Sequence, residues 1–309
     1  MASGVANGVG GAVLVTGAGG FAGSHLLEHL AATPNLVGWS RATVDLLDRE
    51  GVRRTIAQLR PSRIYHCAGA AHVAESWSRT ADTLAANVLA THHLFDAVRR
   101  TGVECRIFVP GSAHVYAPSS SPLTEESPVA PASPYALSKL AQEQLSLRAT
   151  AEDGIEVIVA RVFNHTGPRQ SQSFAASGMA RQIAQIELGR AEPVLRVGNL
   201  DSARDLTDVR DTVRAYTMLM ERGMPGTLYN VASGVAHRTQ EVLDTLVGLA
   251  RVPVRVEIDP ERLRPNDIPV LVGDASRLRA ATGWSPQIPF ARMLSDLLDY
   301  WRSAVGSGQ

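Results

Sequence analysis

The chain is poor in cysteine, in net charge and in long apolar segments, and each shortage excludes a class of protein. Among its 309 residues only Cys67 and Cys105 are cysteines, and their spacing fits no metal site. We therefore expect no metal, no disulfide framework and two buried thiols in a cytoplasmic protein. Thirty basic and thirty acidic residues cancel, so no nucleic-acid or membrane partner is expected. No apolar run approaches the roughly 18 residues of a membrane span, and residues 1–11 lack the basic start of a signal peptide.

The chain is also nearly without lysine. Lys139 is the single lysine among the thirty basic residues, and every other one is an arginine. On a solvated surface either cation serves, whereas a confined site beside a small group favours the compact ammonium over the planar guanidinium. Lys139 therefore marks a position where the chemistry selects against arginine.

A tyrosine precedes Lys139 by four residues, at the start of a predicted helix over 134–150. Ser133 is expected to cap this helix and Pro134 to open it. Tyr135 and Lys139 then share one helical face, where the ammonium and the helix N-terminus would lower the pKa of the phenol from about 10 toward neutrality. Such a pair can act as a general acid–base. The short pattern also fits an exposed tyrosine and lysine on an amphipathic helix, but the single lysine and the residues upstream favour catalysis.

A dinucleotide-binding fingerprint lies near the start of the chain. The apolar, β-branched run 12–16 predicts a strand, and a helical pattern covers 24–30. Between them lies a turn that contains Gly17, Gly20, Phe21 and Gly23. Glycines at these places allow a tight turn, close approach of the backbone to a pyrophosphate and packing of the helix on the strand, with the phosphate at the helix N-terminus.

The end of the second predicted strand, 36–39, indicates which dinucleotide is bound. A site selective for NAD carries a carboxylate about 20 residues after the first glycine, but this chain has Ser40 and Arg41 there. Both side chains suit a 2′-phosphate, so we expect NADP(H) to be preferred and NAD(H) to be usable as well. An ordinary loop arginine remains the alternative interpretation of Arg41. Asp45 and Leu46 follow and could reach the adenine.

Two further strands predict where the cofactor and the reacting group lie. The strand 63–67 is followed by small residues, and a long helix is expected over 83–100. Further cofactor contacts are expected from Ala68, Gly69, Ala70 and Asn87. The strand 106–110 delivers Ser112 to the same edge of the sheet as Tyr135, because the carboxyl ends of parallel strands meet at one edge.

Alternating strands and helices of this length predict an α/β fold, a doubly wound parallel sheet of the Rossmann type. After the strand 155–162 the elements become shorter and breaks more frequent. We expect a dinucleotide-binding domain over 1–164, with 207–232 packing back on it. Residues 165–206 and 233–309 would form a smaller, discontinuous α+β substrate-binding domain.

Motifs in the second half of the chain indicate which kind of dinucleotide-binding enzyme the sequence resembles. These motifs are Arg161–Gln170, Val197–Asp201, Arg204–Asp211, Tyr229–Gly234, Arg264–Pro265, Gly273–Asp274 and Gly283–Pro286. Together with the glycine turn, Ser112, Tyr135 and Lys139, they make nearly the whole chain resemble the extended short-chain dehydrogenase/reductase superfamily. Within it the chain is similar to the branch acting on GDP-sugars, which contains GDP-mannose 4,6-dehydratases and GDP-4-dehydro-6-deoxymannose reductases. Thr207–Asp211 and Leu297–Arg302 look most like the reductases.

The resemblance implies a set of substrate contacts. Those that would hold the diphosphate of a nucleotide sugar, expected to be a GDP-sugar, are Asn164, Arg181, Arg204 and Arg264. Forked guanidinium donors suit a diphosphate, although any single arginine here also fits a surface ion pair. The family further implies a homodimer formed through the helices over 83–100 and 134–150.

The resemblance also implies the reaction. The cofactor would pass a hydride to C4 of a 4-keto sugar while Tyr135 protonates the forming alkoxide, Ser112 bonds the same oxygen and Lys139 binds the nicotinamide ribose. The dehydratases have a glutamate where this chain has His114, which favours reduction, although a histidine is itself a competent acid–base and can equally line the sugar pocket. The open alternatives are a GDP-mannose 4,6-dehydratase, a nucleotide-sugar 4-epimerase and a non-catalytic NADP-sensing protein.

Overall fold

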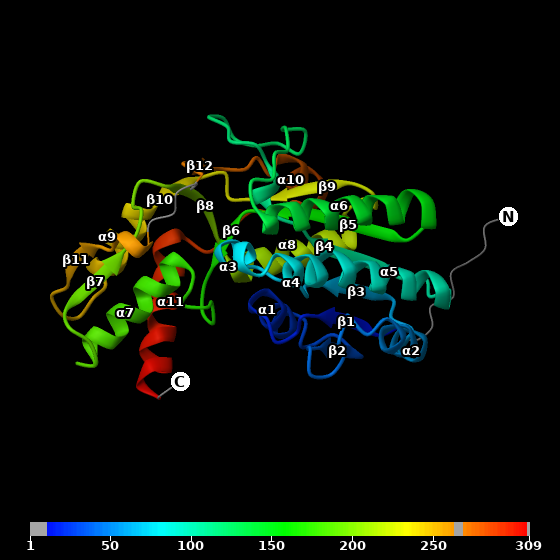
Figure 1. Cartoon of the computed structure of the whole chain (residues 1–309), viewed down its shortest axis with the longest axis horizontal. Coiled ribbons are helices and arrows are strands. Elements are labelled where there is room, and N and C mark those ends of the chain that lie inside the picture. The colour runs from blue at the N-terminus through cyan, green and yellow to red at the C-terminus, as the bar shows by residue number, and fades with distance from the viewer. Residues whose placement is uncertain (1–10, 263–267, 308–309) are drawn as a thin grey trace. The chain divides into compact units, whose positions relative to one another are not determined.

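The computed structural model describes residues 11–262 and 268–307. Within these residues the chain forms two compact units (Figure 1). The first unit ends its longest stretch at Val115 and adds Pro131–Ala160 and Tyr216–Leu228; the second comprises Tyr116–Ala130, Arg161–Ala215 and the residues from Tyr229 onward. The loop 116–130 therefore belongs with the second unit, whereas the expected first domain over 1–164 included it. The assignment of substrate binding to the second unit stays a prediction.

The central sheet has six strands in the order β2-β1-β3-β4-β5-β9. The strands are β1 (Val13–Thr16), β2 (Leu36–Trp39), β3 (Arg63–His66), β4 (Arg106–Pro110), β5 (Glu156–Val162) and β9 (Leu228–Val231). All pairs from β2 to β5 are parallel. The predicted strands and the parallel Rossmann-type sheet are confirmed, with strand ends within one residue of the expected ones.

Helices cover both faces of this sheet. They are α1 (Phe21–His29), α2 (Arg49–Leu59), α3 (Val73–Ser78), α4 (Thr80–Leu84), α5 (Ala90–Thr101), α6 (Pro134–Asp153) and α8 (Val209–Arg222). Side chains of α2, α5 and α6 share one apolar core with Ile107 and Val109 of β4. Phe108 lies between those two residues and so faces the other side, where its ring is 4.6 Å from that of Tyr216 on α8. The sheet is thus doubly wound, as expected.

The helix expected over 83–100 is confirmed, and it contains a π-turn. A single π-helical segment, η1 (Ala85–Leu89), separates α4 from α5. It carries Asn87, which is fully buried. Such π-turns inside α-helices occur often at functional sites, and here the wider turn directs the Asn87 amide toward the end of β3, as described below.

The second unit is built around β8 (Ala203–Asp208). Its strands are β6 (Asn164–Thr166) and β12 (Val270–Leu271), both parallel to β8, β10 (Ala236–Arg238), antiparallel to it, and the separate parallel pair β7 (Val194–Val197) and β11 (Arg255–Ile258). Its helices are α7 (Ala175–Glu187), α9 (Thr239–Gly248), α10 (Ser276–Thr282) and α11 (Phe290–Gly306). The facing sides of α7, α9 and α11 form a second apolar core with β7.

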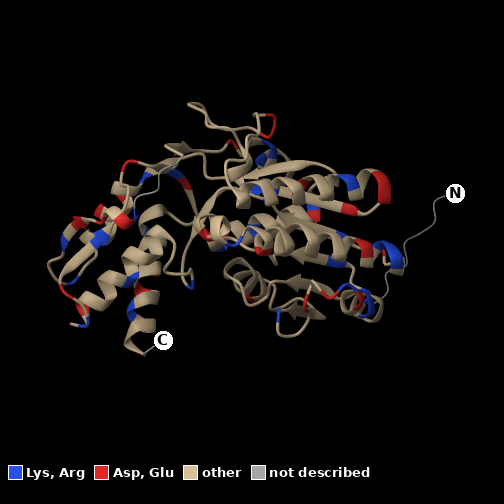
Figure 2. Ribbon diagram, in the orientation of Figure 1, with Lys and Arg blue, Asp and Glu red and all other residues tan. Residues whose placement is uncertain are grey.

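Short 3-10 turns, η2 (Ala113–Val115) and η3 (Pro260–Arg262), complete the described elements. Basic and acidic residues are interspersed along the ribbon of both units (Figure 2), and their numbers cancel to a net charge of zero. None of the helices in the described ranges is both long and apolar enough to cross a membrane.

Candidate active site

The start of α6 is fixed by its own sequence and by α3. Ser133 accepts a hydrogen bond from the backbone N–H of Ala136 at 3.1 Å and Pro134 opens the helix, so the predicted cap is confirmed. The Oγ of Ser76 on α3 accepts from the backbone N–H of Tyr135 at 3.2 Å. Two serine side chains therefore hold the first turn of α6, which carries Tyr135, in one position.

Three of the expected site residues lie together at the end of β4. Ser112 is 3% exposed, and its Oγ accepts from the N–H of His114 at 3.2 Å. The Ser112 hydroxyl lies close enough to the Tyr135 phenol to lower its pKa. The rings of His114 and Tyr135 lie edge to face, 6.1 Å apart. A serine, a tyrosine and a histidine thus face one point, which is what protonation of a substrate oxygen requires.

Lys139 lies one turn further along α6 and is 8% exposed. Its Nζ donates to the carbonyl of Pro110 at 2.6 Å and to Oε1 of Gln142 at 2.5 Å. Burial lowers the pKa of the ammonium to about 8. The site therefore holds a lysine that releases its proton more readily than a lysine in water does.

The prediction that Lys139 lowers the pKa of Tyr135 toward neutrality is wrong. Burial raises the pKa of Tyr135, and the Ser112 hydroxyl lowers it only in part. The reason is that the phenol is desolvated while the ammonium donates elsewhere, to Pro110 and Gln142. In this structure Tyr135 is therefore a neutral phenol, suited to giving a proton rather than taking one.

The glycine turn after β1 has the geometry that a dinucleotide needs. Gly17 has φ +68°, and a Cβ there would lie 2.6 Å from the backbone N of Ala68. A Cβ on Gly23 would lie 2.1 Å from the carbonyl oxygen of Gly17. Gly20 is the N-cap of α1 and has no side chain to cap the helix. The first turn of α1, where the Phe21 ring packs edge-on against His25, thus presents backbone N–H groups to an anion.

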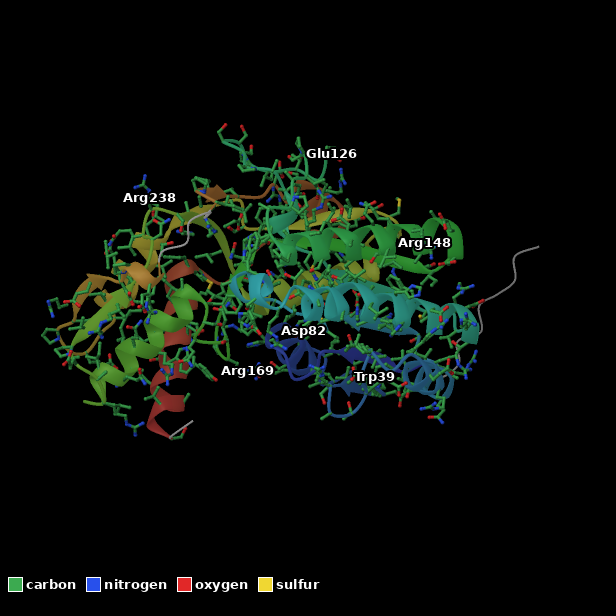
Figure 3. The ribbon with its side chains drawn as sticks, viewed as in Figure 1. Trp39, Asp82, Glu126, Arg148, Arg169 and Arg238 are labelled. Atoms are coloured by element: carbon green, nitrogen blue, oxygen red, sulfur yellow. The ribbon has the colours of Figure 1, made fainter. Side chains whose placement is uncertain are left out.

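The turn after β2 leaves the expected phosphate-binding residues at the surface. Trp39 ends β2 (Figure 3), and the Ser40 N–H then donates to the Thr43 hydroxyl at 2.9 Å, which returns a bond to the Ser40 carbonyl. Arg41 lies at the tip of this turn and is exposed. Asp45 accepts from the Leu47 N–H. Leu46 differs from the others, since its side chain is buried in the core against α2 and α5.

Asn87 holds the segment after β3. Its Oδ1 accepts from the Ala70 N–H at 2.7 Å, and its Nδ2 donates to the Ala70 carbonyl at 3.1 Å and to Ser138 Oγ at 2.8 Å. A Cβ on Gly69 would lie 2.5 Å from Asn87 Oδ1. The residues Ala68–Ala70 are thus clamped between η1 and α6, and the sequence reasoning missed Ser138, whose only signal is its place next to Lys139.

The expected substrate contacts lie in the second unit. Asn164 opens β6, which pairs with β8 so that Asn164 is opposite Leu206, two residues from Arg204. The Arg204 guanidinium donates to the Ala203 carbonyl at 2.9 Å. Arg181 on α7 stacks over the Trp301 ring. The structure therefore brings Asn164 and Arg204 to neighbouring strands, places Arg181 on a helix, and leaves Arg264 outside the described residues.

A buried carboxylate next to Arg204 was not expected. Asp205 is fully buried and accepts from the Ser233 N–H at 2.7 Å, the Ser233 hydroxyl at 2.6 Å, and the N–H groups of Gly234 and Gly273 at 2.9 and 3.2 Å. Burial raises the pKa of Asp205, partly offset by these bonds. This carboxylate joins three chain segments around the strand that carries Arg204, and its partners lie too far away in sequence to be inferred.

The doubly wound sheet, the glycine turn and the Ser112–Tyr135–Lys139 arrangement define an extended short-chain dehydrogenase/reductase. Residues 38–297 match the family model of GDP-mannose 4,6 dehydratase, and the chain belongs to this family.

Three relatives lie close to the chain. It is 37% identical to GDP-6-deoxy-D-mannose reductase of Pseudomonas aeruginosa over 95% of this chain and 98% of that protein. A solved structure of RMD from Pseudomonas aeruginosa complexed with NADPH superposes with a TM-score of 0.87 at 35% identity, covering 95% of this chain and 99% of the other. GDP-mannose 4,6 dehydratase 2 of Arabidopsis thaliana is 31% identical over 82% of this chain and 69% of its own length.

Proposed function

We propose that the chain reduces the C4 ketone of a nucleotide-activated 6-deoxy sugar with NADPH, and that GDP-4-dehydro-6-deoxymannose is the substrate. The observation that carries the proposal is that Ser112, His114 and Tyr135 lie together at the end of β4, with Lys139 one turn further along the helix that carries Tyr135. The likeness to the Pseudomonas aeruginosa GDP-6-deoxy-D-mannose reductase over nearly the full length of both chains supports the choice of substrate.

The roles of the residues follow from their chemistry. Tyr135 is neutral because burial raises its pKa, so it can give its proton to the oxygen at sugar C4 as negative charge develops there. Ser112 donates its hydroxyl proton to the same oxygen. Lys139 binds the nicotinamide ribose and keeps a positive charge beside the phenolate that Tyr135 becomes. NADPH, when bound, supplies the hydride.

The chain fits NADPH at both ends of the cofactor site. The turn at Gly17, Gly20 and Gly23 and the N-terminus of α1 suit the pyrophosphate. Ser40 and the exposed Arg41 suit the 2′-phosphate, and the structural relative RMD was solved with NADPH. NADPH is the preferred cofactor, and NADH is the weaker one.

The sugar site favours reduction over dehydration. Elimination across C5–C6 needs a base for the C5 proton. The dehydratases that this chain resembles carry a glutamate at that position, whereas this chain has His114, whose ring packs against Tyr135, so the carboxylate is missing. Reduction needs no such base, because the hydride and the Tyr135 proton complete it. The dehydratase remains the second candidate, since GDP-mannose 4,6 dehydratases are also relatives of this chain.

For the nucleotide we propose Asn164, Arg181, Arg204 and Arg264 as the residues that hold the diphosphate. Arg204 is supported by the buried carboxylate beside it, which fixes the backbone of β8 through Ser233, Gly234 and Gly273. A rigid strand holds a guanidinium fork in place more accurately than a loop does.

We also propose that the protein is a cytoplasmic homodimer. Leu89 on η1 and Leu137 on α6 are 45% and 52% exposed, on the two helices through which the family resemblance implies pairing. A monomeric mass by light scattering at micromolar concentration would contradict the dimer.

The function is tested by following NADPH oxidation at 340 nm against a panel of nucleotide 4-keto sugars, with Tyr135→Phe as the control. The proposal predicts turnover with GDP-4-dehydro-6-deoxymannose, and a loss of at least about 100-fold in kcat for the control. Binding of NADPH without turnover of any 4-keto sugar would support a cofactor-sensing protein instead.

A further inference from the structure

Behind Lys139 a row of polar side chains runs through the interior of the first unit. Gln142 Oε1 accepts from Lys139 Nζ at 2.5 Å, and Gln142 Nε2 donates to Thr91 Oγ1 at 2.7 Å. Thr91 Oγ1 is also 2.9 Å from His66 Nε2, and His66 Nδ1 is 2.8 Å from Thr16 Oγ1. Lys139 is 8% exposed and His66 1%, while Thr16, Thr91 and Gln142 are fully buried.

The donors and acceptors in this row can be assigned without ambiguity. The ammonium can only donate, so the amide oxygen of Gln142 faces Lys139 and its NH2 faces Thr91. The Thr91 hydroxyl donates its single proton to the Asn87 carbonyl at 2.7 Å, so it must accept from His66. His66 therefore carries its proton on Nε2.

The other end of the row reaches the glycine turn. Because His66 Nδ1 has no proton in this tautomer, it accepts from the hydroxyl of Thr16. Thr16 Oγ1 in turn accepts from the Ala68 N–H at 3.2 Å. The Lys139 ammonium is thus connected through Gln142, Thr91 and His66 to Thr16, the last residue of β1, directly before Gly17.

We propose that Gln142 is a positioning residue for Lys139 in the proposed reduction: backed by Thr91 and the Nε2–H tautomer of His66, it fixes the ammonium beside Tyr135. An ammonium has three protons, and Gln142 and the Pro110 carbonyl take two of them. These two hydrogen bonds set the direction of the third N–H bond, whose proton the nicotinamide ribose would meet.

The surroundings explain why a neutral acceptor at position 142 matters. The charge of Lys139 acts on His66 and Cys67 at the end of β3, and Tyr135 precedes Lys139 by one turn of α6. Burial lowers the pKa of His66 to about 3, raises that of Cys67 to about 12 and raises that of Tyr135, so all three are neutral at pH 7. Glu143, the nearest acidic residue on α6, is buried too, but the pKa of Lys139 is shifted by burial and by Cys67 and not by Glu143.

Without a negative partner among these three groups, the buried ammonium depends on oxygen dipoles. Removing one of its two acceptors will favour the neutral amine, since hydrogen bonds to a charged group stabilise that form. A carboxylate in the same place will favour the ammonium.

The single lysine allows a direct test. In protein grown with labelled lysine and a lysine-free tag, one side-chain signal reports the titration of Lys139. Gln142→Met should lower the pKa of Lys139 by about one unit and kcat by about tenfold, with the KM for the keto sugar changed less than about twofold. Gln142→Glu should raise the pKa of Lys139 by a similar amount and move the alkaline limb of the kcat profile to higher pH.

Ser146→Ala is the matched control. Ser146 is fully buried on the same helix, and its hydroxyl donates to the Gln142 backbone carbonyl at 2.7 Å. This variant should lose stability without moving the titration of Lys139 or the pH profile.

Each outcome is decisive. An unchanged Lys139 pKa in Gln142→Met overturns the positioning role. If Gln142→Met does not fold, an unchanged Lys139 pKa in Gln142→Glu overturns it. The same holds if the nitrogen spectrum of His66 shows the Nδ1–H tautomer. The titration needs no substrate, so expected shifts without turnover of any keto sugar would refute the proposed function and leave the role of Gln142 standing.

Discussion

Replacement of Lys139 by arginine keeps the charge and tests whether the site needs an ammonium. In the structure Nζ is held between two oxygens, 2.6 Å from Pro110 and 2.5 Å from Gln142. The neighbouring residues Ser138 and Gln142 are fully buried, so a longer, planar guanidinium can enter only by displacing one of these partners.

We expect Lys139→Arg to lower kcat/KM at least about tenfold, which equals roughly 1.4 kcal/mol of transition-state stabilisation. Initial rates of NADPH oxidation with GDP-4-dehydro-6-deoxymannose measure the loss. The matched control is Arg148→Lys on the same helix (Figure 3), because the Arg148 side chain is 47% exposed and pairs with Glu152. A Lys139→Arg enzyme within twofold of the unmodified one would refute the reasoning.

Three further predictions follow from the same unit. Gly23→Ala places a Cβ 2.1 Å from the Gly17 carbonyl oxygen, whereas a Cβ at Gly19 meets nothing within 4 Å. Gly23→Ala should therefore lose NADPH binding and more than about 2 kcal/mol of folding stability. Fluorescence titration with NADPH and urea unfolding should find Gly19→Ala unchanged in both properties. Arg41→Ala should weaken NADPH about tenfold and NADH much less; equal effects on both dissociation constants would count against a 2′-phosphate contact. Folding lowers the pKa of Lys139 from 10.5 to about 8, so the unfolded chain binds more protons than the folded chain between these pH values. The free energy of unfolding should therefore rise with pH over this range, by up to about 3 kcal/mol more than in Lys139→Met. An equal change in the free energy of unfolding of the two proteins between pH 8 and pH 10.5, measured with urea, would argue against this.

Local signals in the sequence were sufficient for much of the first unit. The cap at Ser133, the proline after it and the alternation of apolar strands with glycine turns depend on residues within a few positions of one another, and these predictions were confirmed. The lone lysine pointed to a position that the structure shows to be enclosed by backbone and amide oxygens.

The supporting residues could not be predicted because their partners are far away in sequence. Thr16 and His66 are 50 positions apart, and Thr91 and Gln142 are 51 apart. The loop 116–130 joins the second unit through Tyr116, whose hydroxyl donates to Asn230 Oδ1 at 2.7 Å across 114 positions. The rise in the Tyr135 pKa likewise depends on burial, which a helical pattern alone does not report.

The central claim is that this chain transfers a hydride to sugar C4 and a proton from Tyr135 to its oxygen. It is tested most directly by incubating the protein with GDP-4-dehydro-6-deoxymannose and NADPH that carries deuterium at the transferred position. The account predicts one NADP⁺ formed per sugar reduced, with one deuterium at C4 of the product. Formation of a 4-keto-6-deoxy sugar from GDP-mannose without net use of cofactor would contradict it.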